Sequence, residues 1–253
     1  MIMEKHGNNT HENAGGSLAL WQSKSREAID IAPKVVTMAM DYDKASSGLR
    51  DRYEYLCDYV RYREIELLAE HLEKNRVSGA IAEAGVDMGQ TSVILNALFP
   101  ERRLYLYDTF DRFPQEALDV EVQQFGGDPT LADRWQAVHP ESEDRIAFIR
   151  KRCPAQEQVY FRKGVFPQTA EKQDADETFA FVLLDMDLYQ STLDGIRFFY
   201  PRMTSGGYLM LHDYNTTLFK GAKAAVEEAE REFGRFFCMP LPDQGGSLVI
   251  LKT

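Results

Sequence analysis

The sequence contains few cysteines and no long apolar run. Its three cysteines, Cys57, Cys153 and Cys238, are widely spaced and show none of the paired spacings typical of zinc or redox sites. We therefore expect them to be reduced packing residues. No segment approaches the roughly eighteen apolar residues of a transmembrane helix, and residues 1–30 lack the apolar core of a signal peptide. These absences predict a cytoplasmic protein.

Basic residues are also in short supply. The chain has 29 Lys and Arg against 40 Asp and Glu, which gives a net charge of -11 and a pI near 5.0. Nucleic acids and anionic membranes are bound by basic patches, so neither is an expected partner. A small-molecule substrate fits this charge better. With 253 residues, of which 44% are hydrophobic, the chain can bury the core of one main α/β domain.

The pattern of polar and apolar residues divides the chain into three parts. Residues 1–16 are polar and are predicted to form a disordered tail. Residues 17–76 repeat apolar side chains at three- and four-residue intervals, which predicts a helical N-terminal cap. We expect this cap also to mediate homo-oligomerisation. Residues 77–253 alternate short apolar strands with amphipathic helices, which predicts repeated βα units around a mostly parallel sheet.

Seven strands are predicted in this last part. The five parallel ones span residues 80–85, 103–108, 159–163, 179–186 and 208–212, and an antiparallel hairpin follows at 236–241 and 247–252. The result is a three-layer α/β sandwich with the layout of class I, S-adenosylmethionine-dependent methyltransferases. A dinucleotide-binding Rossmann domain more often ends in another parallel crossover. The long connection at 111–158 is predicted to be a lid over the substrate.

The first predicted strand leads into a glycine-containing turn that suits a ligand. Gly85 and Gly89 let the backbone approach a bound molecule, and the helix that follows supplies free N–H groups. The spacing is not the Gly-x-Gly-x-x-Gly of a dinucleotide phosphate site. The acid just before the turn, Glu83, suits a sulfonium or amino group better than a pyrophosphate. The same turn supplies three further candidate cofactor contacts, Val86, Thr91 and Ser92. A plain strand-to-helix turn is the alternative.

An acid at the end of the second strand strengthens this interpretation. Asp108 follows Gly89 by 19 residues, and an acid at about this spacing commonly accepts the hydroxyls of a cofactor ribose. The alternative is that Asp108 caps the N-terminus of the next helix.

Two later strands end abruptly in ionisable residues. Asp185 and Asp187 follow the strand at 179–186, and His212 and Asp213 follow the next one. Since parallel strands deliver their carboxyl ends to the same sheet edge, the four can form one cluster around a divalent cation. The structural alternatives are a helix N-cap for Asp187, a turn cap for Asp213 and a satisfied histidine for His212. Asp185 ends an apolar strand and would be costly to bury unless it is paired or coordinated.

Six spaced segments, in the same order, resemble the macrocin O-methyltransferase family. They span residues 82–89, 108–114, 161–169, 184–192, 200–203 and 206–214. Members of this family include sugar methyltransferases of macrolide and aminocoumarin antibiotic biosynthesis. The resemblance implies transfer of a methyl group from S-adenosylmethionine to a hydroxyl of a small molecule, with a divalent metal. It also adds three cofactor-site residues within these segments, Thr109, Phe110 and Gly164.

The resemblance implies roles for the acids as well. Asp185 and Asp213 match the family's metal ligands, Asp185 also lies at the cofactor, and Asp187 matches the general base. This chain departs from the family at His212, where an acid is usual. Mg²⁺ is the first expectation for the metal. Mn²⁺ is the second, because a histidine ligand would shift the preference of the site away from Mg²⁺. Two rival functions remain, an NAD-dependent Rossmann oxidoreductase and a non-catalytic cofactor-binding protein of the same fold.

Overall fold

The computed structural model describes residues 58–130 and 145–253. The chain divides into two units, Met1–Tyr59 and Val60–Thr253, and the described residues lie almost entirely in the second. The predicted tail, most of the predicted cap and part of the predicted lid lie outside the described residues. No helix within the described residues combines the length and the apolar character that a membrane crossing needs.

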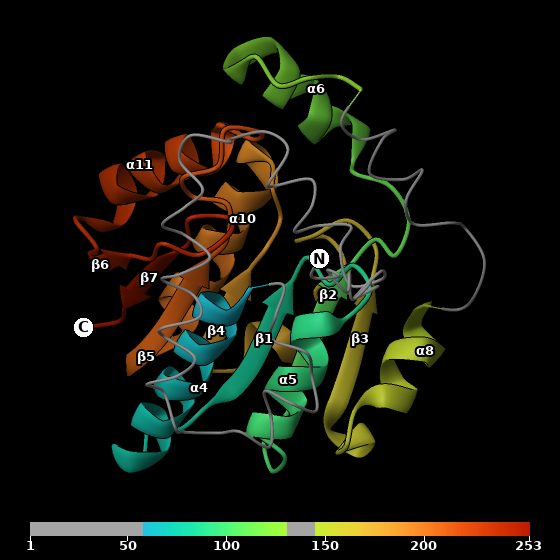
Figure 1. Cartoon of the computed structure of the whole chain (residues 1–253), viewed down its shortest axis with the longest axis vertical. Coiled ribbons are helices and arrows are strands. Elements are labelled where there is room, and N and C mark those ends of the chain that lie inside the picture. The colour runs from blue at the N-terminus through green and yellow to red at the C-terminus, as the bar shows by residue number, and fades with distance from the viewer. Residues whose placement is uncertain (1–57, 131–144) are drawn as a thin grey trace, which may run out of the picture. The chain divides into compact units, whose positions relative to one another are not determined.

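A seven-stranded sheet forms the centre of this unit and confirms the predicted topology (Figure 1). Its order is β3-β2-β1-β4-β5-β7-β6, with β1 to β5 parallel and β6 and β7 antiparallel to their neighbours. This is the class I methyltransferase arrangement. The strands are β1 (Ala80–Ala84), β2 (Leu104–Asp108), β3 (Val159–Lys163), β4 (Phe179–Leu184), β5 (Met203–Leu211), β6 (Phe237–Pro240) and β7 (Leu248–Leu251).

Two strand boundaries differ from the predicted ones in ways that matter. β4 ends at Leu184 rather than at residue 186, so Asp185 lies in the loop that follows it. β5 begins at Met203, five residues before its predicted start, and runs through Gly206 and Gly207. The prediction missed this part because it has no apolar alternation. A side chain at Gly207 would lie 2.7 Å from the carbonyl oxygen of Ala180 on β4, so the strands approach closely there.

Helices cover both faces of the sheet. The helices are α4 (Tyr59–Lys74), α5 (Gln90–Leu98), α6 (Gln115–Phe125), α8 (Arg145–Arg152), α9 (Lys172–Ala175), α10 (Tyr189–Phe199) and α11 (Gly221–Phe233), with 3-10 turns at Gln156–Gln158 and Tyr200–Arg202. Apolar residues of α10 and α11 pack with every second residue of the central strands in one buried cluster. On the other face, Phe99, which directly follows α5, packs against Phe181, and α4 contacts β5 through a 2.6 Å hydrogen bond between His71 and Tyr208.

A buried carboxylate on α6 binds the N-termini of α10 and α11. Glu121 is fully buried and accepts hydrogen bonds from the backbone N–H groups of Tyr189 (3.0 Å) and Gly221 (2.9 Å). These are the first residues of α10 and α11, so one side chain caps two helices. A side chain at Gly221 would overlap the Glu121 carboxylate. The part of the predicted lid that contains α6 is therefore anchored to the domain.

A buried ion pair ties β3 to the segment before β4. Arg162 donates two hydrogen bonds to Asp174, at 2.7 and 2.8 Å, and Asp174 is completely buried. Asp174 also accepts from the backbone of Glu171, which completes the capping box of α9. Burial by itself would raise the pKa of Asp174, but these hydrogen bonds hold it below its usual value.

We expect Asp174→Asn to lower the free energy of unfolding by about 3–5 kcal/mol at neutral pH, because Arg162 loses its buried carboxylate partner and keeps only Glu171, which is half exposed. The folded-state pKa of Asp174 lies below its unfolded value. The stabilisation is therefore present above the unfolded pKa and is lost as the pH falls through the folded pKa. Urea unfolding from about pH 7 down to about pH 2 measures this.

The matched control is Arg231→Met, which breaks an exposed pair with Glu228 and should cost less than about 1 kcal/mol. A difference between wild type and Asp174→Asn that stays constant over the whole pH range would contradict the assignment.

Candidate active site

Backbone strain gathers at the carboxyl edge of the sheet. Four non-glycine residues with left-handed φ values follow the ends of β1, β2, β4 and β5: Asp87 (49°), Phe110 (50°), Asp187 (60°) and Asp213 (56°). Among the described residues one further non-glycine residue, Arg76, shares this conformation. Such backbone costs about 1–3 kcal/mol each and tends to cluster at functional sites. The carboxyl edge of the sheet is therefore the candidate site.

The glycine turn after β1 touches the end of β4. Gly85 has a φ of 87°, and a side chain there would overlap the carbonyl oxygen of Asp185 and lie 2.5 Å from its carbonyl carbon. At the next glycine, Gly89, a side chain would lie 2.5 Å from Ile149 of α8. The turn predicted to bind the cofactor and the acids predicted to bind a metal are thus in direct contact.

Asp108 joins this turn to the loop after β2. One carboxylate oxygen accepts from the backbone N–H groups of Val86 (2.6 Å) and Asp87 (3.1 Å), and the other accepts from Phe110 (2.6 Å). Thr109 and Gly164 lie beside it, since the Thr109 hydroxyl is 3.4 Å from the Asp108 carboxylate and the Gly164 N–H donates to its carbonyl oxygen. The helix-cap alternative is wrong, because Pro114 precedes α6. The ribose role stays a prediction.

Glu83 lies beneath the turn rather than at its surface. Its side chain is buried and accepts a hydrogen bond from the hydroxyl of Ser92, which is buried on α5 beside the equally buried Thr91. Burial raises the pKa of Glu83 well above its usual value, even though the Ser92 hydrogen bond acts in the opposite direction. Glu83 and Ser92 therefore pair with each other, and their contact with a cofactor stays a prediction.

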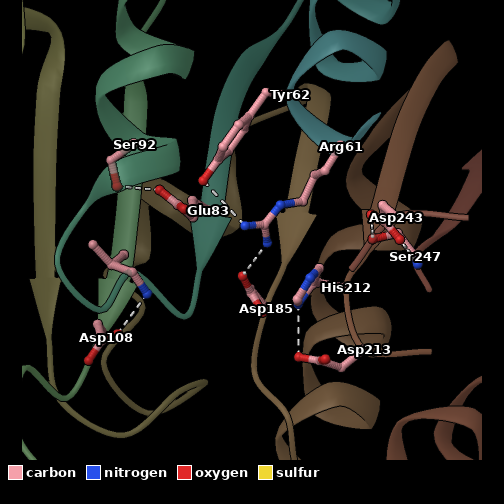
Figure 2. A network of polar contacts seen from close by, with 11 residues as sticks. Arg61, Tyr62, Glu83, Ser92, Asp108, Asp185, His212, Asp213, Asp243 and Ser247 are labelled. Carbon is pink, nitrogen blue, oxygen red and sulfur yellow. Dashed lines mark hydrogen bonds and ion pairs between the residues drawn. The ribbon is translucent and has the colours of Figure 1, made fainter. Parts of the chain in front are cut away.

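The ionisable residues after β4 and β5 do come together. The register of the two strands aligns Leu184 with Leu211, so Asp185 and His212 follow side by side. His212 Nδ1 lies 2.8 Å from a carboxylate oxygen of Asp185 and 2.8 Å from one of Asp213 (Figure 2).

The charges in this cluster depend on one another. Burial would lower the pKa of His212, but the carboxylates of Asp185 and Asp213 raise it to about 11. Burial would raise the pKa of Asp185, but His212 and Arg61 hold it below its usual value. Asp187 has a pKa raised well above normal, first by burial and then by Asp213 and Asp185. Asp187 therefore binds a proton more tightly than Asp185 does.

The structural alternatives for the acids are not what the structure shows. Leu188 precedes α10 as its N-cap residue, and Glu121 accepts the first N–H of that helix, so Asp187 is not its cap. The carboxylate of Asp213 faces His212, and it is the backbone oxygen of Asp213 that accepts from Thr216 in the turn. His212 is part of the acid cluster, because its Nδ1 lies within hydrogen-bonding distance of both Asp185 and Asp213.

Two contributors to the site were not predicted. Arg61 of α4 forms an ion pair with Asp185 at 3.2 Å. In the sequence it looks like its neighbour Arg63, which pairs with Glu66 inside the helix, so no local signal separates the two. Gly245, in the turn between β6 and β7, lies against the His212 ring, where a side chain would come within 2.5 Å of Cε1. Glycine in a hairpin turn predicts a bend but not this contact.

Asp185, His212 and Asp213 form a donor set that fits a small divalent cation. One ligand atom from each lies within 4.8 Å of the others, and His212 Nδ1 faces the same space as both carboxylates. Two oxygens and one imidazole nitrogen suit Mn²⁺, Fe²⁺ or Zn²⁺ at least as well as Mg²⁺. Because the ligating nitrogen must be unprotonated, binding would release the His212 proton.

Comparison with known proteins identifies the family. The family described as Macrocin-O-methyltransferase (TylF) matches residues 53–234. The chain belongs to this family. The predicted resemblance is thus confirmed, and the antiparallel end of the sheet agrees with it rather than with the NAD-dependent alternative.

Individual relatives carry related names. The chain is 29% identical over 180 residues to the demethyldecarbamoylnovobiocin O-methyltransferase of Streptomyces niveus, covering 68% of this chain and 66% of that one. It is 27% identical over 167 residues to the 8-demethyl-8-(2,3-dimethoxy-alpha-L-rhamnosyl)-tetracenomycin-C 4'-O-methyltransferase of Streptomyces olivaceus, covering 61% of this chain and 60% of that one. In each case slightly less than two thirds of the relative's length is matched.

Solved structures agree on the fold. The O-methyltransferase NovP is similar with a TM-score of 0.64 and 27% identity, over 76% of this chain and 79% of that one. The calicheamicin methyltransferase CalS11 has a TM-score of 0.65 over 99% of both chains, at 16% identity. This last similarity shows the fold alone.

We expect Gly85→Ala to lower the free energy of unfolding by at least about 4 kcal/mol, because the new side chain would overlap the backbone of Asp185. The control is Gly126→Ala, which has a similar positive φ of 69° and nothing within 4 Å of the added atom. Its cost should be about 1–2 kcal/mol, from the backbone conformation alone. Equal losses for the two variants in chemical unfolding would show that the contact with Asp185 is not tight.

Proposed function

We propose that this protein transfers a methyl group from S-adenosylmethionine to a hydroxyl of a small sugar or glycosylated molecule. The observation that carries the proposal is the direct contact between the Gly85 turn and Asp185. It joins the predicted cofactor turn to the cluster of Asp185, His212 and Asp213 at one edge of the sheet, which supports the proposal that the two act together. Family membership and the names of the relatives support this assignment.

The cofactor would lie across the carboxyl ends of β1 and β2, where open α/β sheets bind their ligands. The adenosine would meet the loop that Asp108 organises, and the sulfonium end would meet the Gly85 turn and Asp185. The N–H groups at the start of α5 and the closeness of the backbone at Gly85 favour a ligand here. Glu83 and Ser92 would support the turn from below.

The chemistry needs an acceptor oxygen that has lost its proton. We assign Asp187 as the group that takes this proton, because it lies beside Asp213 and Asp185 and its raised pKa makes it a stronger base than an ordinary carboxylate. As the acceptor O–H bond breaks, the oxygen forms a bond to the methyl carbon. The carbon–sulfur bond breaks at the same time, and its electron pair goes to sulfur, giving S-adenosylhomocysteine. Such a displacement depends mainly on in-line alignment.

A divalent cation would be held by Asp185, His212 and Asp213. When bound, it would lower the pKa of the acceptor hydroxyl and offset the charge of the acids. In the metal-free protein these residues hold one another in place through the hydrogen bonds of His212 Nδ1. Asp187 stands next to this donor set, so the proton-accepting group and the cation ligands share one end of the site.

The acceptor is proposed from charge and from the relatives. The net charge of -11 disfavours a nucleic acid or an anionic membrane as partner. One relative's name includes a rhamnosyl group, which supports a sugar hydroxyl as the methylated position. The insertion that contains α6 and α8 would border the acceptor, and we keep homo-oligomerisation through the N-terminal segment as a prediction.

We expect Asp187→Asn to lower the rate of methyl transfer by about 10²–10⁴-fold, the usual contribution of a general base. The affinity for S-adenosylhomocysteine should stay within about threefold, because the variant removes a proton acceptor and not the cofactor turn. Single-turnover methylation of a glycosylated acceptor and calorimetric titration measure the two effects.

The matched control is Asp176→Asn, an exposed residue just before β4, which should leave both quantities unchanged. A wild-type rate in the Asp187 variant would remove it from the mechanism, and failure of the wild-type protein to bind the cofactor would refute the proposed function.

A further inference from the structure

Arg61 of α4 contacts the carboxyl edge of the sheet, where the cofactor is proposed to bind. Arg61 lies near the start of α4, and its guanidinium lies between Glu83 and Asp185 in Figure 2. It donates to Asp185 at 3.2 Å and to the Tyr62 hydroxyl at 3.3 Å, and its side chain is only 12% exposed. A cation held this far from water is costly unless it serves anionic groups.

The position of Arg61 differs from that of His212, the other cation of the cluster. His212 lies between Asp185 and Asp213, on the side of β5. Arg61 approaches Asp185 from the side of β1 and acts electrostatically on both Asp185 and Glu83. Arg61 therefore lies beside Asp185, whose backbone the Gly85 turn contacts, and the sulfonium end of the proposed cofactor would lie here.

We infer that Arg61 binds the α-carboxylate of the methionine part of S-adenosylmethionine. This inference rests on the proposed function and adds a specificity residue to it. The methionine end carries an ammonium group and a carboxylate, and an acidic edge with Asp185, Asp187 and Asp213 would repel the carboxylate. A guanidinium offers five N–H donors in one plane, and such a group can serve two carboxylates at once. Arg61 would thus offset the charge of Asp185 and also pair with the carboxylate of the ligand.

Decarboxylated S-adenosylmethionine tests this directly, because it lacks only the carboxylate. Calorimetric titration of the full-length, metal-stripped protein should show that wild type binds S-adenosylmethionine about 10- to 100-fold more tightly than the decarboxylated form, the size expected for a charge-assisted hydrogen bond. In Arg61→Met this ratio should fall to within about threefold. Arg61→Lys, which keeps the charge but loses the planar fork, should give an intermediate ratio.

The control is Arg103→Met, which removes the same charge from a half-exposed arginine that pairs with Glu177 just before the start of β2, at the end of the strand away from the ligand edge. It should keep the wild-type ratio, which excludes a long-range effect of net charge at physiological salt. An unchanged ratio in Arg61→Met would overturn the inference, even if both affinities fell, because Arg61 would then act only by positioning Asp185. If Arg61→Met does not fold, a wild-type ratio in Arg61→Lys overturns it instead. If the wild-type protein binds both ligands equally well, only the inferred role of Arg61 is refuted. If it binds neither ligand, the proposed function is refuted.

Discussion

The repulsion among carboxylates at one edge of the sheet is the constraint on which this site depends. The register between β4 and β5 leaves no choice about where these groups lie, since pairing of Leu184 with Leu211 places the residues after them side by side. Like charges this close cannot all ionise without a cation. In the described structure the imidazole of His212 supplies one, held between Asp185 and Asp213, and Arg61 supplies another. Burial, together with the charges of Asp213 and Asp185, raises the pKa of Asp187.

The rest of the domain keeps this cluster in place. Gly85 allows β1 to approach the backbone of Asp185, and Asp108 fixes the turn that contains it. Glu121 caps α10 and α11 and so sets the helix that begins directly after the acids. Each contact joins segments that are distant in the sequence, so the site is formed by tertiary structure and not by any single motif.

The sequence predicted most of the sheet because buried parallel strands are continuous apolar runs, as at β4, and because acids end two of them. It placed the start of β5 too late, since a Thr-Ser-Gly-Gly stretch has no pattern that indicates a strand. The acids of the site were found from their position after strands. The sequence did not reveal the roles of Arg61, Glu121 and Gly245. Each role depends on a partner on another element, and these partners (Asp185, Tyr189 and His212) lie 124, 68 and 33 residues away. Helical periodicity and turn composition carry no information about such partners.

The ionisation of His212 in the metal-free protein tests the central claim most directly. Long-range proton–nitrogen correlation spectra of the imidazole report its protonation state through the nitrogen chemical shifts. With a pKa raised to about 11, the ring should stay cationic through pH 9, well above the ordinary histidine range. Replacing Asp185 by Asn should bring its titration down toward that range. A neutral His212 at about pH 7.5 in the wild-type protein would contradict the account, because the acids would then need some other cation to lie together.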